Sequence, residues 1–197
     1  MSKSNGFKKI EGIKNLKKYN LSTPKTIFIF DFEKQEKEID NFIKDRDYVM
    51  IRSDKDNDID FCPHDLRCPK SKAKEFIKEL ISKNYAAILQ ECIPWTENQV
   101  SGNILTFKKD MLIELMEGGP LILLNRDGRL DEYVKLRRDN SKEIEHLGKR
   151  LIKKKELENI LNLIKKVPPY KIIEFAIGPT WFYFWQIRDD KTTKRLE

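Results

Sequence analysis

The sequence contains few of the features that stabilise secreted domains or hold proteins in membranes. Its 197 residues include only three cysteines, an odd number spread widely along the chain. A disulfide framework is therefore not expected, and a reducing, cytoplasmic compartment is. The longest apolar runs, at 26–32 and 178–185, are far shorter than the roughly 20 residues of a membrane span. The first residues lack the apolar segment of a secretory signal.

Glycine, proline and histidine are also scarce. Eight glycines and eight prolines, beside 39% hydrophobic and 36% charged residues, indicate a folded chain rather than a disordered one. With only two histidines, the sequence offers no Ser/His/Asp or Cys/His nucleophile constellation. The chain length suits one domain or two small lobes that share a cleft.

The net charge is positive, but the charges are mixed along the chain. There are 39 Lys and Arg against 32 Asp and Glu, a formal charge of +7. No Arg/Gly-rich or aromatic-basic motif of nucleic-acid-binding proteins stands out. We interpret the densest basic runs, 8–18 and 149–155, as solvated helix faces, which could also steer a polyanion such as ATP.

Hydrophobic periodicity in the first half of the chain predicts strands alternating with helices. The predicted strands are 26–32, 48–53 and 85–93, and the predicted helices are 33–44 and 71–84. Ser71 is the expected N-cap of the second helix. The polar stretch 54–69 is interpreted as a loop closed by two prolines.

The second half predicts a meander, one long helix and a hairpin. The predicted strands are 100–107, 111–116, 121–125, 171–177 and 181–187. Asn140 and Glu143 match a capping box at the start of a single helix whose apolar stripe continues to Lys166. This grouping indicates an α+β protein of two lobes, residues 1–93 and 94–197, with Pro94 as a hinge.

The predicted terminal hairpin brings three polar side chains together. Residues symmetric about a turn face each other, so Glu174 and Gln186 are expected to lie opposite. Gln186 and Arg188 are expected on one face of their strand, because side chains alternate. A carboxylate, an amide oxygen and a guanidinium suit Mg²⁺ and the phosphates of a nucleotide.

The hairpin sequence resembles the end of a known nucleotide-binding domain. Residues 172–176 read I-I-E-F-A and residues 184–189 read F-W-Q-I-R-D. They are similar to the D-I-E-W-A and L-Q-x-R-P segments of the phosphoenolpyruvate synthase and pyruvate phosphate dikinase family. That family carries an ATP-grasp domain, so the resemblance implies two α+β lobes around a nucleotide cleft. It also implies that Glu174 and Gln186 are metal ligands and that Arg188 is a catalytic, phosphate-binding residue.

Further matches to this family occur upstream in the same order. Residues 48–53 resemble the V-x-R-S-S strand, which implies that Arg52 contacts the transferable phosphate. Residues 11–16 resemble G-G-K-x-x-N-L, which implies the same for Lys14. Residues 87–93 are similar to the V-Q-x-M-V strand beside the adenine. The backbone hinge that binds the base would then be formed by Gln90, Glu91, Cys92 and Ile93.

The resemblance implies a Mg²⁺-dependent phosphotransferase or ligase that uses ATP. Its acceptor stays open and could be a small carboxylate, a histidine of a partner protein or part of a nucleic acid. The family's glycine-containing phosphate loop is replaced by residues 54–69, and its phosphohistidine domain is not in this sequence. We therefore expect a partner protein to supply that domain. The alternatives are a nucleotide-binding sensor without turnover and a basic RNA-binding protein.

Two further motifs allow two interpretations each. Residues 62–68 read C-P-H-D-L-R-C, so Cys62, His64 and Cys68 either ligate a metal such as zinc or lie in a polar loop with Cys62 buried. The aromatic run 181–185 suggests a stacking platform for bases. Because alternation sends these side chains to two faces, core packing is the preferred interpretation.

Overall fold

The computed structural model describes residues 6–55, 62–93, 99–118 and 128–190. Contacts between Cα atoms divide the chain into two compact units. The first contains Met1–Glu11 and Pro24–Pro94, and the second contains Gly12–Thr23 and Trp95–Glu197. The division differs from the predicted lobes in residues 12–23, which group with the second unit. The identity of the lobes as nucleotide-binding lobes stays a prediction.

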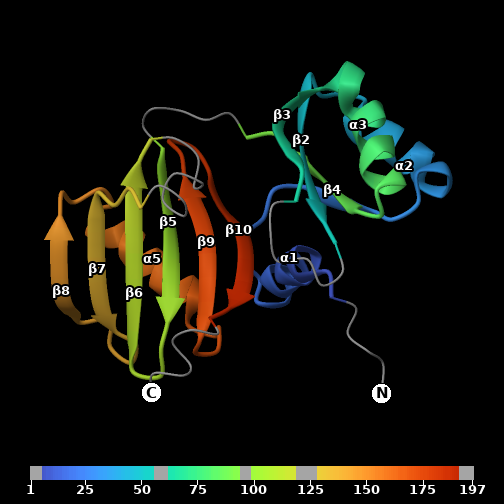
Figure 1. Cartoon of the computed structure of the whole chain (residues 1–197). Coiled ribbons are helices and arrows are strands. Elements are labelled where there is room, and N and C mark those ends of the chain that lie inside the picture. The colour runs from blue at the N-terminus through green and yellow to red at the C-terminus, as the bar shows by residue number, and fades with distance from the viewer. Residues whose placement is uncertain (1–5, 56–61, 94–98, 119–127, 191–197) are drawn as a thin grey trace, which may run out of the picture. The chain divides into compact units, whose positions relative to one another are not determined.

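The first unit is an antiparallel sheet with two helices on one face (Figure 1). Its strand order is β1-β4-β2-β3. The strands are β1 (Thr26–Ile29), β2 (Tyr48–Asp54), β3 (His64–Pro69) and β4 (Ala86–Glu91), and the helices are α2 (Phe32–Ile43) and α3 (Lys70–Ser82). Apolar residues of both helices pack against alternate strand residues such as Ile51 and Leu89 to form the core of this unit.

Strand β3 corrects the predicted loop at 54–69. Its residues pair with β2 at the edge of the sheet, and its Arg67 stacks over the Tyr48 ring at 4.6 Å. Edge strands are short and polar, so hydrophobic periodicity does not reveal them. The predicted N-cap Ser71 is also wrong, because α3 begins at Lys70 with Pro69 at the cap position and no side-chain cap.

The second unit is a six-stranded antiparallel sheet in the order β10-β9-β5-β6-β7-β8. The strands are β5 (Val100–Thr106), β6 (Asp110–Glu117), β7 (Glu132–Arg137), β8 (Glu143–Gly148), β9 (Lys171–Ile177) and β10 (Phe182–Asp189).

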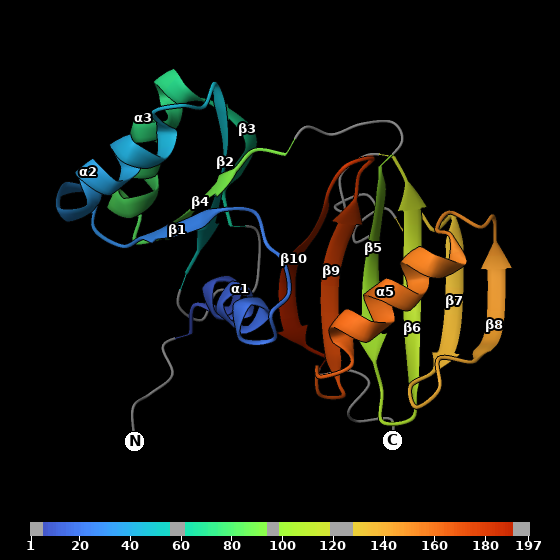
Figure 2. The same cartoon turned by 180° about the vertical axis from the view of Figure 1, so that it is seen from behind.

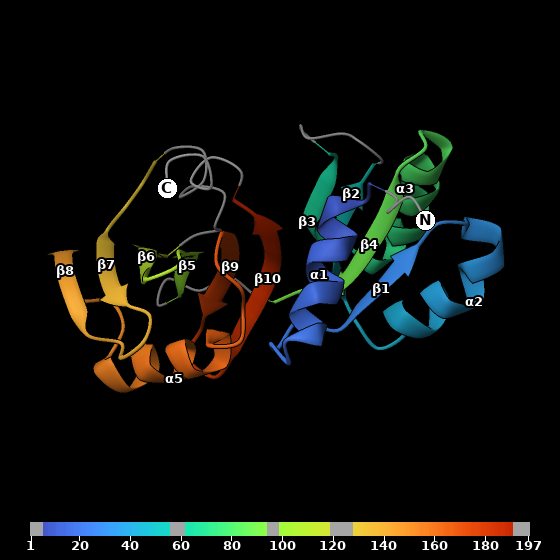
Figure 3. The same ribbon diagram turned by 90° about the horizontal axis from the view of Figure 1, so that it is seen from below.

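Helix α5 (Lys154–Ile164) runs obliquely across one face of this sheet (Figure 2). Figure 3, which looks along the strands, shows the helix lying beneath the sheet on a single side. Its buried residues, including Ile160 and Ile164, meet Ile104, Phe175 and Phe184 in the core. The apolar face of the six-stranded sheet is therefore the face that α5 covers.

The predicted long helix at 140–166 is wrong in its first half. Residues 143–148 form the edge strand β8, and the helix begins only at Lys154. Ile144 and Leu147, which fit the helical stripe, are 47% and 58% exposed. Gly148 has φ +86, and a Cβ there would lie 2.1 Å from the Asp131 carbonyl oxygen. That turn ends the strand and separates it from the helix. The predicted strand 121–125 lies outside the described residues.

Helix α1 (Lys8–Lys18) is divided between the two units. Its first turn belongs to the first unit, where the Asp54 carboxylate accepts the backbone N–H groups of Lys9 and Ile10 at 2.8 and 3.0 Å. Its remainder belongs to the second unit, where Leu16 enters the core. No helix among the described residues is long and apolar enough to cross a membrane.

Candidate functional site in the terminal hairpin

The hairpin places Glu174 and Gln186 directly opposite each other, as predicted. Between the turn and Phe184, β10 follows a register that would bring Trp185 opposite Glu174. The register shifts between Phe184 and Gln186, so that Gln186 pairs with Glu174 instead. This β-bulge decides which side chain of β10 meets the carboxylate. Sequence symmetry about the turn did not reveal it.

Arg188 completes the predicted group. Its Nε lies 3.6 Å from Oε1 of Glu174. The Glu174 side chain is 13% exposed and that of Arg188 is 46% exposed, so the carboxylate is mostly enclosed while the guanidinium reaches solvent. We call Glu174, Gln186 and Arg188 the hairpin triad. Because the guanidinium reaches solvent, this ion pair adds only about 0–1 kcal/mol to stability.

Three further oxygen-bearing side chains continue across the sheet from the triad. In register, Glu174 pairs with Asn103 on β5, Asn103 with Glu114 on β6, and Glu114 with Tyr133 on β7. We call Gln186, Glu174, Asn103, Glu114 and Tyr133 the oxygen row. Paired residues of an antiparallel sheet share a face, and Ile104 of β5 faces α5. The oxygen row therefore lies on the face opposite α5.

The members of this row outside the hairpin were not predicted from the sequence. A sequence signal for Asn103 was present in β5, where the polar residues Ser101 and Asn103 alternate with residues of the opposite face. Burial raises the pKa of Tyr133, and the negative charges of Glu145 and Glu114 raise it further. The row is therefore electronegative at its β7 end.

Helix α1 approaches the hairpin through a glycine. A Cβ at Gly12 would lie 2.4 Å from the Ile187 carbonyl oxygen and 3.2 Å from Cγ of Gln186. Only glycine permits this approach without displacement. The predicted phosphate-binding residue Lys14 lies on the same helix, two residues further on, with an exposed side chain.

Other predicted site residues lie in the first unit. Arg52 and Gln90 lie on one face of its sheet, because Met50 pairs with Gln90 and Met50 and Arg52 are two apart on β2. The opposite face carries Ile51 and meets the helices. Gln90 is fully buried, and its Nε2 donates to Oγ1 of Thr26 at 3.0 Å.

The other predicted hinge residues follow directly. The Glu91 N–H donates to the Lys25 carbonyl at 2.9 Å, and the Cys92 thiol donates to the Leu66 carbonyl at 3.5 Å. Ile93 is buried. The Glu91 N–H therefore already has a backbone acceptor, and the role of this segment toward a base stays a prediction.

The metal interpretation of Cys62, His64 and Cys68 gains no support. Cys68 pairs with Val49 and points into the core, whereas His64 pairs with Arg52 on the helix-free face. Burial is the main cause that raises the pKa of Cys68 to about 11. Within the described ranges, no group of three or more His, Cys, Asp or Glu side chains is arranged to hold a metal ion.

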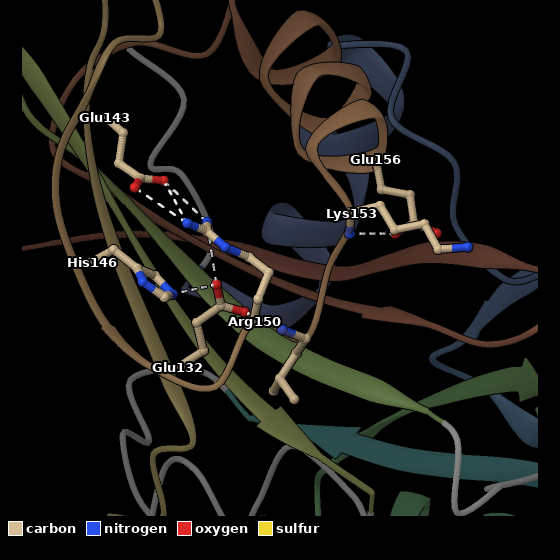
Figure 4. Close-up of polar contacts among 7 residues, drawn as sticks. Glu132, Glu143, His146, Arg150, Lys153 and Glu156 are labelled. Atoms are coloured by element: carbon tan, nitrogen blue, oxygen red, sulfur yellow. Dashed lines mark hydrogen bonds and ion pairs between the residues drawn. The ribbon is translucent and has the colours of Figure 1, made fainter.

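A second charged cluster lies on the α5 side of the sheet (Figure 4). The buried carboxylate of Glu132 accepts the Leu151 N–H at 2.6 Å and contacts His146 Nε2 at 3.0 Å. Arg150 lies 3.4 Å from Glu132 and bonds Glu143 through both of its NH groups. Every oxygen of Glu132 is thus engaged with β8 or the segment after it. These contacts hold the edge strand β8 against β7.

Comparisons with known proteins identify the fold. No protein-family model matches the sequence, and no curated protein matches it. Solved structures do match. D-alanyl-alanine synthetase A from Vibrio cholerae O1 biovar eltor superposes with a TM-score of 0.56 at 7% identity, over 94% of this chain and 55% of that one. N5-carboxyaminoimidazole synthetase from Staphylococcus aureus superposes with a TM-score of 0.56 at 13% identity, over 93% and 44%.

A third neighbour is an ATP-grasp ligase associated with a peptide product in Chryseobacterium gregarium, solved with ADP and with a leader and core peptide. Its TM-score is 0.53 at 15% identity, over 93% of this chain and 52% of that one. The chain thus spans about half the length of these structures. At such identities the likeness concerns the fold alone. The predicted α+β fold is confirmed, and this chain has an ATP-grasp-like fold.

Proposed function

We propose that this chain binds ATP with Mg²⁺ at the hairpin triad and activates an acceptor by phosphoryl transfer. The observation that carries the proposal is the register and contact of Glu174, Gln186 and Arg188. The fold supports it, since the neighbours include ligases solved with ADP. The narrower family, phosphoenolpyruvate synthase and its relatives, is part of the proposal.

The triad fits a magnesium ion. Mg²⁺ takes oxygen ligands, and commonly only one or two from the protein beside phosphates and water. The carboxylate of Glu174 and the amide oxygen of Gln186 would hold it. When bound, the ion would neutralise charge on the phosphate oxygens.

The remaining residues would bind and orient the nucleotide. Arg188, whose guanidinium is 46% exposed, would hold phosphate oxygens bidentately. Glu174 keeps that guanidinium in place through their contact. Arg52 and Lys14 would stabilise the negative charge that develops as the phosphoryl group moves in line to the acceptor. The segment from Gln90 to Ile93 would bind the adenine.

The neighbours support one class of acceptor. ATP-dependent ligases activate one group before joining it to another, and one neighbour holds a peptide. A carboxylate of a small molecule or peptide is therefore our first choice. A phosphohistidine domain on a partner protein is the alternative that the sequence resemblance implies.

A binding subunit without turnover is the second candidate function. The observation that favours it is the charge of the triad, which offers a single carboxylate that already contacts Arg188. Such a site would hold Mg²⁺ more weakly than one with two free carboxylates. Release of ADP in the presence of ATP and Mg²⁺ separates the two candidates.

Calorimetric titration of ATP, with and without Mg²⁺, tests the proposal. We expect the intact chain to bind ATP more tightly with Mg²⁺. The Glu174→Ala variant should lose on the order of tenfold in affinity with Mg²⁺ and little without it. Glu158→Ala is the matched control, because Glu158 is exposed on α5, on the other face of the sheet. The absence of binding at millimolar ATP would refute the proposal.

A further inference from the structure

Asn103 is the first member of the oxygen row outside the hairpin. It pairs with Glu174 of β9 on one side and with Glu114 of β6 on the other. Its side chain is only 6% exposed. An amide is thus enclosed between two carboxylates, on the strand that adjoins Glu174.

The position of this amide is specific. Neighbouring strands lie about 4.8 Å apart, so paired side chains on one face are in direct reach of each other. The other residues of β5 on this face do not repeat the pattern, since Ser101 pairs with Ala176 and Met116. Asn103 is thus the residue of β5 whose register on this face places it between two carboxylates.

We propose that Asn103 supplies a third oxygen ligand to the divalent cation held by Glu174 and Gln186. The inference rests on the proposed function, which places the cation there. An amide oxygen suits Mg²⁺ and adds no negative charge. The protein ligands then keep a total charge of −1, which Arg188 offsets through its contact with Glu174. Additional carboxylates would repel the phosphates that must bind the same cation.

With Asn103 as a ligand, strand β5 would hold the metal together with the two strands of the hairpin. The hairpin triad alone comes from two strands, whereas the extended set comes from three adjacent strands, β10, β9 and β5. Ligands on packed strands are held more rigidly than ligands on a loop. Glu114, one strand further, would contribute negative potential to the site without contacting the metal.

The test uses Mn²⁺ as the metal probe with the full chain. Free Mn²⁺ is followed by electron paramagnetic resonance during titration into protein saturated with ATP. We expect Asn103→Leu to raise the Kd for Mn²⁺ on the order of tenfold and to leave the affinity for metal-free ATP unchanged. Asn103→Asp, which retains an oxygen at this position, should bind Mn²⁺ more tightly than Asn103→Leu. Ser101→Ala, on the same strand and face, should match wild type.

The outcomes separate this inference from the function on which it rests. If wild type binds no Mn²⁺ with ATP, the proposed function fails. If wild type binds it and folded Asn103→Leu binds it equally well, Asn103 is not a ligand. Circular dichroism identifies a variant that does not fold. In that case Asn103→Ala replaces Asn103→Leu, and wild-type Mn²⁺ affinity in the folded Asn103→Ala protein would overturn the inference.

Discussion

Asp54 shows how one side chain can serve a distant helix. It ends strand β2, yet its carboxylate accepts the first backbone N–H groups of α1, 44 and 45 residues away in the sequence. Those N–H groups have no partner within the helix. The residue is 1% exposed, and burial raises its pKa above the ordinary 3.8, against the opposing effect of the bonded N–H of Ile10 and the charge of Lys9.

The direction of this shift predicts a pH dependence. Because the folded-state pKa lies above 3.8, the folded protein binds the proton more tightly than the unfolded chain does. The contribution of Asp54 to the free energy of unfolding therefore falls as pH rises from about 3.8 through the folded pKa, and is constant above it. The Asp54→Asn variant has no titrating group at this position and lacks this dependence.

Urea unfolding of wild type and Asp54→Asn at a series of pH values measures the effect. The stability of wild type relative to the variant should decline with rising pH over that window and then level off. A relative stability that increases with pH would contradict the shift. Asp54→Ala removes the cap itself and should cost about 1 kcal/mol at neutral pH.

Single residues also show what the sequence could and could not predict about the site. The predicted pairing of Glu174 with Gln186 is present, but the position of the turn does not account for it. It depends on the bulge beside Trp185, whose extra residue has no sequence signal. From the sequence, Asn103 could be recognised only as a polar residue within a predicted strand. Its partners became known from strand order, which no local pattern specifies.

Strand β8 depends on a buried charge rather than on apolar contacts. Its side chains are mostly exposed, and Figure 4 shows Glu132 of β7 engaging His146 and Arg150. A hydrophobic stripe that crosses from β8 into α5 made this region look like one helix. The apolar residues Ile144 and Leu147 follow helical spacing but lie on an edge strand. Periodicity cannot separate the two cases when charges decide the pairing.

Removing this charge should release the edge strand. Glu132→Ala takes away an acceptor shared by the Leu151 N–H, the His146 ring and Arg150, and we expect it to lower the free energy of unfolding by about 3 kcal/mol. Glu132→Gln retains an acceptor for Leu151 and should cost less. The measurement is denaturant unfolding combined with amide hydrogen exchange of β8.

The matched control is Glu143→Gln, whose carboxylate is 40% exposed and bonds the same Arg150. An exposed ion pair contributes about 0–1 kcal/mol, so this variant should remain near wild type. Equal losses for Glu132→Ala and Glu143→Gln would show that burial of Glu132 is not the cause.

At the scale of the whole molecule, the two units have separate cores. Ile51 belongs to the cluster beneath α2 and α3, and Ile104 belongs to the cluster beneath α5. Both side chains are fully buried. Fold class was predictable at this scale, because strand and helix periodicities dominate it. The grouping of residues 12–23 with the second unit was not, since it depends on contacts far apart in sequence.

Separate cores predict separable responses to mutation. Ile51→Ala should cost about 2–5 kcal/mol and accelerate amide exchange in β1 to β4 more than in β5 to β10. Ile104→Ala should show the reverse pattern. Native-state hydrogen exchange resolved by residue measures both. If either variant accelerates exchange equally throughout, the units unfold as one.

The contact at Gly12 also has a consequence for the order of synthesis. Gly12 fits against the backbone of Ile187, which the ribosome adds 175 residues later, as 187 − 12 gives. The second half of α1 therefore emerges early and must wait for β10 before it can dock. Contacts of such long sequence separation form late. During that interval Leu16 and Leu21, both buried in the finished core, are available to chaperones that recognise apolar segments of nascent chains.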